Sequence, residues 1–389
     1  MTFLDLFAGI GGFRFGLEQA GHKCIGFCEI DKFARRSYKV IHDTRKEVEL
    51  HDITTVTSDA LRQMRRPDIL SGGFPCQSFS YSGKRRGFRD TRGTLFFEIA
   101  RFASILQPRI LFLENVRGLL SHDRGDTFQE ILRTLDGLGY DLEWQVLNSK
   151  DYVPQNRERV YIVGHLRESG STQVFPFQRE GEHVSGPDES SIRIQSLGNI
   201  NPSGNGLSGK VYHSTGLSPT LMAGSEVKIS IPTKSSNGLI LAGNLEGVFE
   251  QGNRVYSEAG CAPTVTTKAD ALKILVKEAT RKGYKEAKPG DSINCSHPNS
   301  DTRRGRVGNQ IANTLLTSEE QAVVTEDYEI RKLTAKECWR LQGFPDWAYE
   351  KAAKVNSEYQ LYRQAGNSVT VPVIFDIARR FKVVNVNGL

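Results

Sequence analysis

The sequence predicts an α/β protein whose main domain is a Rossmann-like, doubly wound, mostly parallel sheet. Strand-like and helical runs alternate from the N-terminus to about residue 165, which is typical of a parallel sheet with helices on both faces. From about residue 170 the chain is richer in Gly, Ser, Pro and Asn and holds only short β-like runs. We therefore expect an inserted, smaller and β-rich domain, and 389 residues are enough to form both cores.

A glycine-rich turn follows the first strand-like run, Thr2–Phe7, and leads into a helical stretch. The glycines within Ala8–Phe13 let the backbone approach a ligand closely, although such a turn alone also fits an ordinary strand–helix connection. The next strand-like run ends in Glu29, and a third ends beside Asp52. An acidic residue about 20 positions beyond the glycines is the usual partner of a ribose hydroxyl pair. The arrangement predicts a nucleoside-containing cofactor, without a spacing that requires phosphate.

A cysteine follows the next strand-like run. A short run with the apolar residues Ile69 and Leu70 leads into Gly72–Ser80, which contains Cys76 directly after a proline. We expect this thiol at the carboxyl end of a strand, where open α/β sheets bind ligands. The basic segment Ser82–Arg89 would favour the nucleophilic thiolate. A lone cysteine is more often a buried structural residue, so the functional interpretation depends on further motifs.

Two further segments supply polar groups beside apolar runs. Leu111–Leu113 continues directly into Glu114, which predicts a carboxyl group in apolar surroundings with a raised pKa. Arg157 and Arg159 precede the strand-like run Val160–Gly164, and their spacing predicts that they share one face.

The C-terminal part returns to helical texture. Thr334 followed by Glu337 has the pattern of a capping box at the start of a helix. The segment Leu341–Pro345 should end that helix, and Val371–Phe381 is a last amphipathic segment.

Taken in order, these motifs resemble those of the bacterial DNA cytosine-5 methyltransferases of restriction–modification systems. The resemblance covers about 180 residues at the N-terminus and about 60 at the C-terminus. The stretch between is far less alike, as expected of a region that selects the DNA sequence. The motifs are Asp5-Leu6-Phe7-Ala8-Gly9-Ile10-Gly11-Gly12, Glu29, Asp52, Gly73-Phe74-Pro75-Cys76-Gln77, Glu114-Asn115-Val116, Gln155-Asn156-Arg157-Glu158-Arg159 and Gln364-Ala365-Gly366-Asn367-Ser368-Val369.

The resemblance implies the fold of S-adenosylmethionine-dependent methyltransferases. Residues 1–180 and 357–389 would form the catalytic and cofactor-binding domain, 181–335 the target-recognition domain, and 336–356 a hinge segment. The enzyme would transfer a methyl group from S-adenosylmethionine to C5 of a flipped-out cytosine in a short specific duplex sequence, leaving S-adenosylhomocysteine. Alternatives are a tRNA cytosine-5 methyltransferase and a catalytically inactive DNA-binding protein on the same fold.

The resemblance also assigns roles to individual residues. Cys76 would add to C6 of the cytosine, Glu114 would hydrogen-bond N3, and Arg159, with Arg157 as a further candidate, would hold O2 or the adjacent phosphate. Ile30 departs from the family, in which many members carry an aromatic residue; an aliphatic side chain can still cover an adenine face. The expected cofactor-binding residues are Phe7, Ile10, Gly12, Glu29, Ile30, Asp52, Ile53, Gly73, Pro75, Leu95, Asn367 and Val369.

DNA contacts are expected in two places. The net charge is +6, but residues 181–330 carry 15 Lys/Arg and 17 Asp/Glu, a net −2 that leaves +8 for the remainder. We therefore expect the catalytic domain to hold the phosphates and the middle region to read bases. The candidates are Gln77, Ser80, Ser82, Lys84, Arg85, Arg86 and Arg89 after the cysteine, and Arg254, Arg303, Arg304, Arg306 and Thr314 in the middle region.

The middle region contains three repeat-like units. Segments 197–221 recur as 242–265 at an offset of 44 or 45 residues, and a weaker third copy includes Arg306–Gly308 and Asn313–Leu315. Such repeats usually form stacked supersecondary units, and all three could be scaffold. We expect the third unit to read bases, because Arg303, Arg304 and Arg306 form a dense cationic cluster beside Thr314.

Other features limit the remaining possibilities. No run of 18 apolar residues occurs, so we expect neither a signal peptide nor a membrane span. The six cysteines are scattered without a paired Cys/His set, which argues against a metal site. We expect a cytoplasmic, DNA-associated monomer, bacterial or phage-encoded, that acts on double-stranded DNA. The sequence leaves open whether a restriction endonuclease accompanies it.

Overall fold

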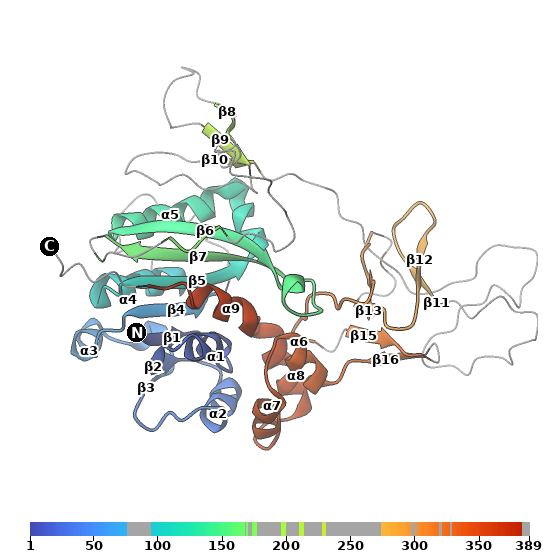
Figure 1. Cartoon of the computed structure of the whole chain (residues 1–389), viewed down its shortest axis with the longest axis horizontal. Coiled ribbons are helices and arrows are strands. Elements are labelled where there is room, and N and C mark those ends of the chain that lie inside the picture. The colour runs from blue at the N-terminus through green and yellow to red at the C-terminus, as the bar shows by residue number, and fades with distance from the viewer. Residues whose placement is uncertain are drawn as a thin grey trace, which may run out of the picture. The chain divides into compact units, whose positions relative to one another are not determined.

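The chain folds into two compact units in this computed structural model. The sheet unit comprises residues 1–147, 158–233 and 371–389, and the second unit comprises 148–157 and 234–370. The structure describes residues 1–75, 95–167, 169, 173–176, 274–296, 300, 302–318, 321–326 and 329–382, together with the backbone of three short strands within 196–230 (Figure 1).

A seven-stranded sheet forms the centre of the sheet unit. Its strand order is β3-β2-β1-β4-β5-β7-β6. Neighbouring strands from β3 to β5 are parallel, and β7 runs antiparallel to β5. This order confirms the predicted doubly wound, mostly parallel sheet. The strands are β1 Thr2–Leu6, β2 Lys23–Cys28, β3 Val48–Leu50, β4 Ile69–Gly73, β5 Ile110–Val116, β6 Tyr140–Asn148 and β7 Glu158–Leu166.

Helices cover both faces of this sheet. The main helices are α1 Gly12–Gln19, α2 Lys32–Ile41, α3 Ser58–Gln63, α4 Leu95–Leu106, α5 Asp126–Gly137 and α9 Val371–Ala378. Short 3₁₀ turns are η1 Ile53–Thr55, η2 Arg117–Leu120 and η3 His122–Gly125.

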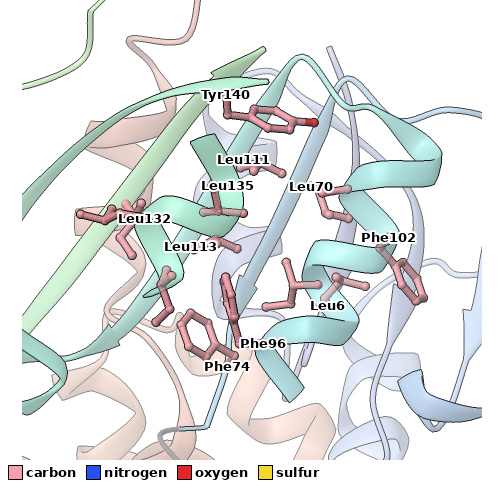
Figure 2. Packing of buried hydrophobic residues seen from close by; sticks show 14 of the residues in the cluster. Leu6, Leu70, Phe74, Phe96, Phe102, Leu111, Leu113, Leu132, Leu135 and Tyr140 are labelled. Carbon is pink, nitrogen blue, oxygen red and sulfur yellow. The ribbon is translucent and has the colours of Figure 1, made fainter. Parts of the chain in front are cut away.

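The alternation of side chains along β5 explains why both faces are covered. Leu111 and Leu113 belong to the buried cluster that β1, β4, α4 and α5 also supply (Figure 2). Phe112, between them, packs its ring edge-on against Phe13 of α1 and Phe381. Successive side chains of a strand point to opposite faces, so an unbroken apolar run needs helices on both sides. Burying each such side chain contributes about 1.5–3 kcal/mol.

The end of the chain returns to its beginning. Helix α9 packs on α1, and a Cβ built on Gly16 would lie 2.6 Å from Cβ of Ile374. The predicted amphipathic segment from Val371 is therefore confirmed as a helix of the sheet unit. Close helix contact of this kind leaves room only for glycine.

Where the second unit is described, it combines short strands with helices. Its antiparallel sheet has the order β14-β13-β15-β16, and β11 pairs with β12. The elements are β11 Ile274–Lys277, β12 Tyr284–Ala287, β13 Ser292–Asn294, β14 Val307–Gly308, β15 Gln321–Val324, β16 Ile330–Lys332, α6 Ala335–Leu341, α7 Asp346–Ala353, α8 Glu358–Asn367 and the 3₁₀ turn η4 Ser149–Asp151.

The capping box at Thr334 is confirmed: the Thr334 hydroxyl accepts from the Glu337 amide, and the Glu337 carboxylate accepts from the Thr334 amide.

The expected domain boundary at residue 357 differs from the observed one. Helices α6 and α8 lie in the same unit, because Trp339 Nε1 donates to the Leu361 carbonyl at 3.0 Å and the Tyr362 hydroxyl donates to the Leu333 carbonyl at 2.6 Å. Segment 336–356 is therefore part of the second unit rather than a separate hinge, and the chain enters the sheet unit again only at Val371.

The first repeat copy contains strands where its backbone is described. β8 Ser196–Asn199 pairs antiparallel with β9 Lys210–His213, and β10 Lys228–Ser230 pairs parallel with β9. In the third copy, β14 includes Val307 and Gly308. The second copy, with Arg254, lies outside the described residues. The β-rich character of the middle region is confirmed in the parts that are described.

Candidate active site

The predicted site residues of the sheet unit follow the carboxyl ends of adjacent strands. Leu6 of β1 lies opposite Cys28 of β2 and Gly72 of β4. The strand order reverses beside β1, where connections lead toward β2 on one side and β4 on the other. Ligands of open α/β sheets bind at this switch point. Phe7, Glu29 and Asp52 come one or two residues beyond the ends of β1, β2 and β3.

Glu29 is held in place by two backbone amides. Gly9 N donates to Oε2 at 2.8 Å, and Asp31 N donates to Oε1 at 2.7 Å. Burial raises the pKa of Glu29, and these two donors oppose that shift. Each carboxylate oxygen can accept more than one hydrogen bond. Glu29 is therefore oriented by the glycine turn and can still accept from a pair of hydroxyl groups.

The glycine turn has a backbone that few side chains tolerate. Gly11 has φ 89°, and a Cβ there would lie 2.3 Å from Nε2 of His42. Phe7 also has a left-handed φ of 52°, a conformation that costs free energy and is often found at functional sites. Ile10 and Gly12 are buried beside it. Their burial favours a role in shaping the turn.

The ends of β2 and β3 expose one apolar side chain and fix one carboxylate. Ile30 is 66% exposed, so its side chain is free to cover an apolar ligand face. Asp52 Oδ1 accepts from the hydroxyl and the amide of Thr54, which lowers the pKa of Asp52. Ile53 is buried beneath this turn.

Asn115 fixes the chain that leads to the cysteine. This side chain is 2% exposed, and its Nδ2 donates to the Phe74 carbonyl at 2.9 Å. Gly73 of β4 lies opposite Glu114 of β5 in the sheet. Asn115 belongs to the motif Glu114-Asn115-Val116, but no local sequence pattern predicts that its partner is the Phe74 carbonyl. Cys76 and the expected DNA-contacting residues Gln77, Ser80, Ser82, Lys84, Arg85, Arg86 and Arg89 lie outside the described residues.

Glu114, which is buried, forms an ion pair with the partly buried Arg159. Arg159 Nε lies 2.9 Å from Glu114 Oε1, and Glu114 is 7% exposed. The antiparallel register places Glu114 opposite Tyr161 and Arg159 opposite Val116, so the pair is diagonal across β5 and β7. Burial favours a neutral acid, whereas the guanidinium favours a carboxylate. The proton expected on Glu114 stays a prediction.

Arg157 lies in different surroundings from Arg159. It precedes β7 and belongs to the second unit, where it is 4% exposed. Its guanidinium donates to the carbonyls of Leu315, Gly366 and Ser368 at 3.2, 3.1 and 2.6 Å. The expectation that Arg157 shares a strand face with Arg159 is wrong, because β7 begins only at Glu158.

The predicted base-reading cluster of the second unit is only partly at the surface. Arg306 is 0% exposed and donates to the Ser296 carbonyl at 2.8 Å. Burial, with Arg303 nearby, lowers the pKa of Arg306. Arg303 and Arg304 are half-buried, and the Thr314 hydroxyl donates to the Asn156 carbonyl at 2.7 Å. The burial of Arg306 corrects the expectation of a surface reader at that position.

Two of the described cysteines do not have the surroundings of a nucleophile. Cys24 and Cys28 are buried in β2, and burial raises the pKa of each thiol to about 12. Across the described ranges, no group of three or more His, Cys, Asp or Glu side chains could hold a metal ion. Where helices are described, none is long and apolar enough to span a membrane.

The chain is similar to known proteins over almost its whole length. A family model described as C-5 cytosine-specific DNA methylase matches residues 1–383. The chain is 31% identical to orphan methyltransferase M.SPRI of Bacillus phage SPR, with 96% of this chain and 95% of the relative covered. It is 32% identical to type II methyltransferase M.HhaI of Haemophilus parahaemolyticus, with 97% and 93% covered. A solved DNA modification methyltransferase encoded within an E. coli prophage has a TM-score of 0.52 at 20% identity, covering 98% of both chains, which supports the fold.

Proposed function

The chain belongs to the C-5 cytosine-specific DNA methylases, and from that premise we propose that it methylates one cytosine within a short specific duplex sequence through a covalent bond between Cys76 and C6. Members of this family transfer a methyl group from S-adenosylmethionine to C5 of cytosine in DNA, and this chain is such an enzyme. The observation that supports the mechanism best is the ion pair of the buried Glu114 with Arg159 beside the strand end that leads to Cys76.

The chemistry must first make C5 nucleophilic. The Cys76 thiolate adds to C6, and Glu114, carrying or sharing a proton, donates a hydrogen bond to N3 that stabilises the negative charge developing on the ring. Arg159, paired with Glu114, orients that carboxyl group and is placed to hold O2. C5 would then bond to the methyl carbon while the bond between that carbon and the sulfonium sulfur breaks, which leaves S-adenosylhomocysteine. Loss of the C5 proton to a base restores the C5–C6 double bond and breaks the C6–S bond, which regenerates the Cys76 thiolate.

The residues at the strand ends fit S-adenosylmethionine, which supplies an electrophilic methyl group on a sulfonium. Glu29, oriented by Gly9 and Asp31, would accept from the ribose hydroxyls. The exposed Ile30 would cover one face of the adenine, and Asp52 with Ile53 would contact its edge. Further proposed contacts are those of Phe7, Ile10, Gly12, Gly73, Pro75, Leu95, Asn367 and Val369.

The target base must leave the helix for this reaction. C6 and N3 cannot be reached in a stacked duplex, so the cytosine is flipped out of the stack. Gln77 and Ser80 would fill the gap or grip flanking phosphates, and the basic segment that follows them would hold the backbone. Base reading falls to the middle region. There Arg304 and Thr314 are partly exposed candidates, and Arg254 is a candidate in the second repeat.

The relatives include type II methyltransferases and orphan methyltransferases of phages. We propose that this enzyme acts as a monomer in a bacterial cytoplasm and protects DNA from a cognate restriction endonuclease. An orphan role without an endonuclease is the alternative that the phage relatives suggest.

A methyl-transfer assay tests the proposal directly. Purified protein is incubated with S-adenosylmethionine labelled in the methyl group and with either duplex DNA or tRNA. We expect label in DNA only, and bisulfite sequencing of DNA from cells expressing the protein gives the methylated sequence. Label in tRNA alone would establish the alternative substrate, and label in neither would indicate an inactive binding protein.

The base-reading candidates need a second assay. Each of Arg254, Arg304 and Thr314 is changed to alanine, and the methylated sites are mapped. A base reader relaxes the requirement at one position, because one bidentate pair discriminates by roughly 1–3 kcal/mol. A phosphate contact instead weakens methylation uniformly and reduces its salt dependence. Relaxation by Arg254→Ala alone would move the reader to the second repeat.

A further inference from the structure

Within the second unit, the segment before β7 pairs with a distant segment of the middle region. Asn156 N donates to the Ala312 carbonyl at 2.7 Å, and Ala312 N donates to the Pro154 carbonyl at 2.8 Å. The side chain of Gln155 extends the pairing, because its Oε1 accepts from Leu315 N at 3.1 Å. The backbone of residues 312–315 is thus fixed by a motif that precedes it by more than 150 residues.

Gln155 is itself fixed to the end of helix α6. It is 0% exposed, and its Nε2 donates to the Leu341 carbonyl at 2.8 Å. The next residue, Gln342, is also 0% exposed and donates to the Ala365 carbonyl at 2.8 Å near the end of α8. Buried amides whose bonds are made on both sides rigidify their surroundings. The pairing of 154–157 with 312–315 is therefore anchored to two helices.

Arg157 connects segment 312–315 with the end of α8, because its guanidinium donates to backbone carbonyls of both. One terminal nitrogen donates to Leu315, and the other donates to Gly366 and Ser368. The planar guanidinium can hold acceptors on separate segments at once, which a lysine ammonium on its flexible stem does less well. These three acceptors are main-chain carbonyl oxygens of this protein.

Gly366 allows residues 316–317 to pack closely against α8. A Cβ at this position would lie 2.1 Å from the Leu316 carbonyl oxygen and 2.8 Å from Thr317 N. Its φ is not left-handed, so the backbone conformation does not require glycine. Glycine within a helix costs about 1 kcal/mol relative to alanine. The close approach of residues 316–317 is the physical reason for a glycine in α8.

We infer that Arg157 and Gly366 are positioning residues that seat segment 314–317 against the end of α8 and thereby set the fidelity with which the enzyme selects its DNA sequence. This inference rests on the proposed function, in which Thr314 belongs to the base-reading region. Arg159, two residues farther along the chain, serves the reacting cytosine instead. The two arginines of one short motif thus have separable effects, one on site selection and one on turnover.

The test compares Arg157→Lys and Gly366→Ala with Arg159→Lys and with Gly137→Ala. Gly137 is a matched control, because it also lies in a helix and a Cβ there would meet nothing within 4 Å. Each variant is assayed at saturating S-adenosylmethionine on two duplexes, one with the site found by bisulfite sequencing and one with a single recognised base pair changed. The measured quantity is the specificity ratio: kcat/KM on the duplex with the recognised site divided by kcat/KM on the duplex with the changed base pair.

We expect Arg157→Lys and Gly366→Ala to lower this ratio about tenfold or more, since one readout at a base edge discriminates by that order. Arg159→Lys should lower kcat on both duplexes by about 10²-fold with the ratio unchanged, and Gly137→Ala should change neither. If Gly366→Ala does not fold, Arg157→Lys decides alone, because it keeps the positive charge.

An unchanged ratio in Arg157→Lys with reduced kcat would overturn the inference and place Arg157 with the reacting base. Failure of the wild-type protein to methylate DNA would instead contradict the proposed function.

Discussion

The two units of this protein use polar side chains in different ways. In the sheet unit, Glu29 and Asp52 lie just beyond the ends of β2 and β3, and Glu114 lies two residues before the end of β5, so the parallel order places them at one edge. In the second unit, buried polar groups such as Gln155 and Arg157 bind backbone carbonyls and amides of segments far away in the sequence. Polar side chains near the strand ends are therefore available to bind ligands and react. Buried side chains that hydrogen-bond to the backbone instead hold distant segments in place.

The largest expected effect concerns the strand end that leads to Cys76. Cys76→Ser should keep the fold and cofactor binding but abolish turnover, because a serine hydroxyl has no ionised fraction near pH 7. No adduct should form on duplex DNA containing 5-fluorocytosine, which traps the wild-type intermediate because fluorine cannot leave as a proton. Denaturing gels of the protein–DNA mixture measure the adduct. A fully active serine variant would remove Cys76 from the mechanism.

The second largest effect is a loss of methylation rate when Glu114 is changed. Glu114→Gln should slow methylation by roughly 10²-fold or more, a typical loss for a general acid or electrostatic group. DNA affinity should change little, because most of it comes from phosphate contacts. Single-turnover rates and filter binding measure the two quantities. A rate within a factor of about two of wild type would make Glu114 a structural carboxylate that pairs with Arg159.

In the sheet unit, Asn115 is a buried side chain that hydrogen-bonds to a backbone carbonyl, as Gln155 and Arg157 do in the second unit. Asn115→Ala removes the buried donor to the Phe74 carbonyl, and leaving that acceptor unpaired should cost about 1–3 kcal/mol of unfolding free energy. Because the chain before Cys76 is then less well fixed, we also expect kcat to fall roughly tenfold. Urea unfolding and steady-state rates provide the two measurements. Lost stability with unchanged kcat would contradict a role in placing the cysteine.

The smallest effect is predicted for the capping box of α6. Hydrogen bonding to Arg331, then to Thr334, lowers the pKa of Glu337 from 4.5 to about 2. A carboxyl whose pKa is depressed in the folded state stabilises the fold above pH 4.5, and this contribution is lost as the pH falls through 2. Glu337→Gln should therefore destabilise the protein by about 1 kcal/mol at pH 7. The difference in Tm between variant and wild type should be smaller at pH 3.5 than at pH 7. An equal difference at both pH values would contradict a stabilising role of the ionised Glu337 carboxylate.

Local sequence patterns are enough to predict the sheet and the residues at its carboxyl edge. Unbroken apolar runs such as Leu111–Leu113 need helices on both faces, and the residue that ends each run must lie at the carboxyl edge of a parallel sheet. The capping box at Thr334 was equally predictable, because a cap depends on residues only three positions apart. These are local patterns, and short-range geometry is enough to interpret them.

The roles of the buried polar residues depend on contacts between segments that are distant in the sequence. Arg157 and Arg159 are alike in sequence, yet one binds Leu315, Gly366 and Ser368 while the other pairs with Glu114. The boundary at Val371 and the burial of Arg306 likewise depend on contacts between distant segments. A buried polar group must find a hydrogen-bond partner. Which segment supplies that partner depends on how the chain packs, and spacing along the sequence does not contain that information.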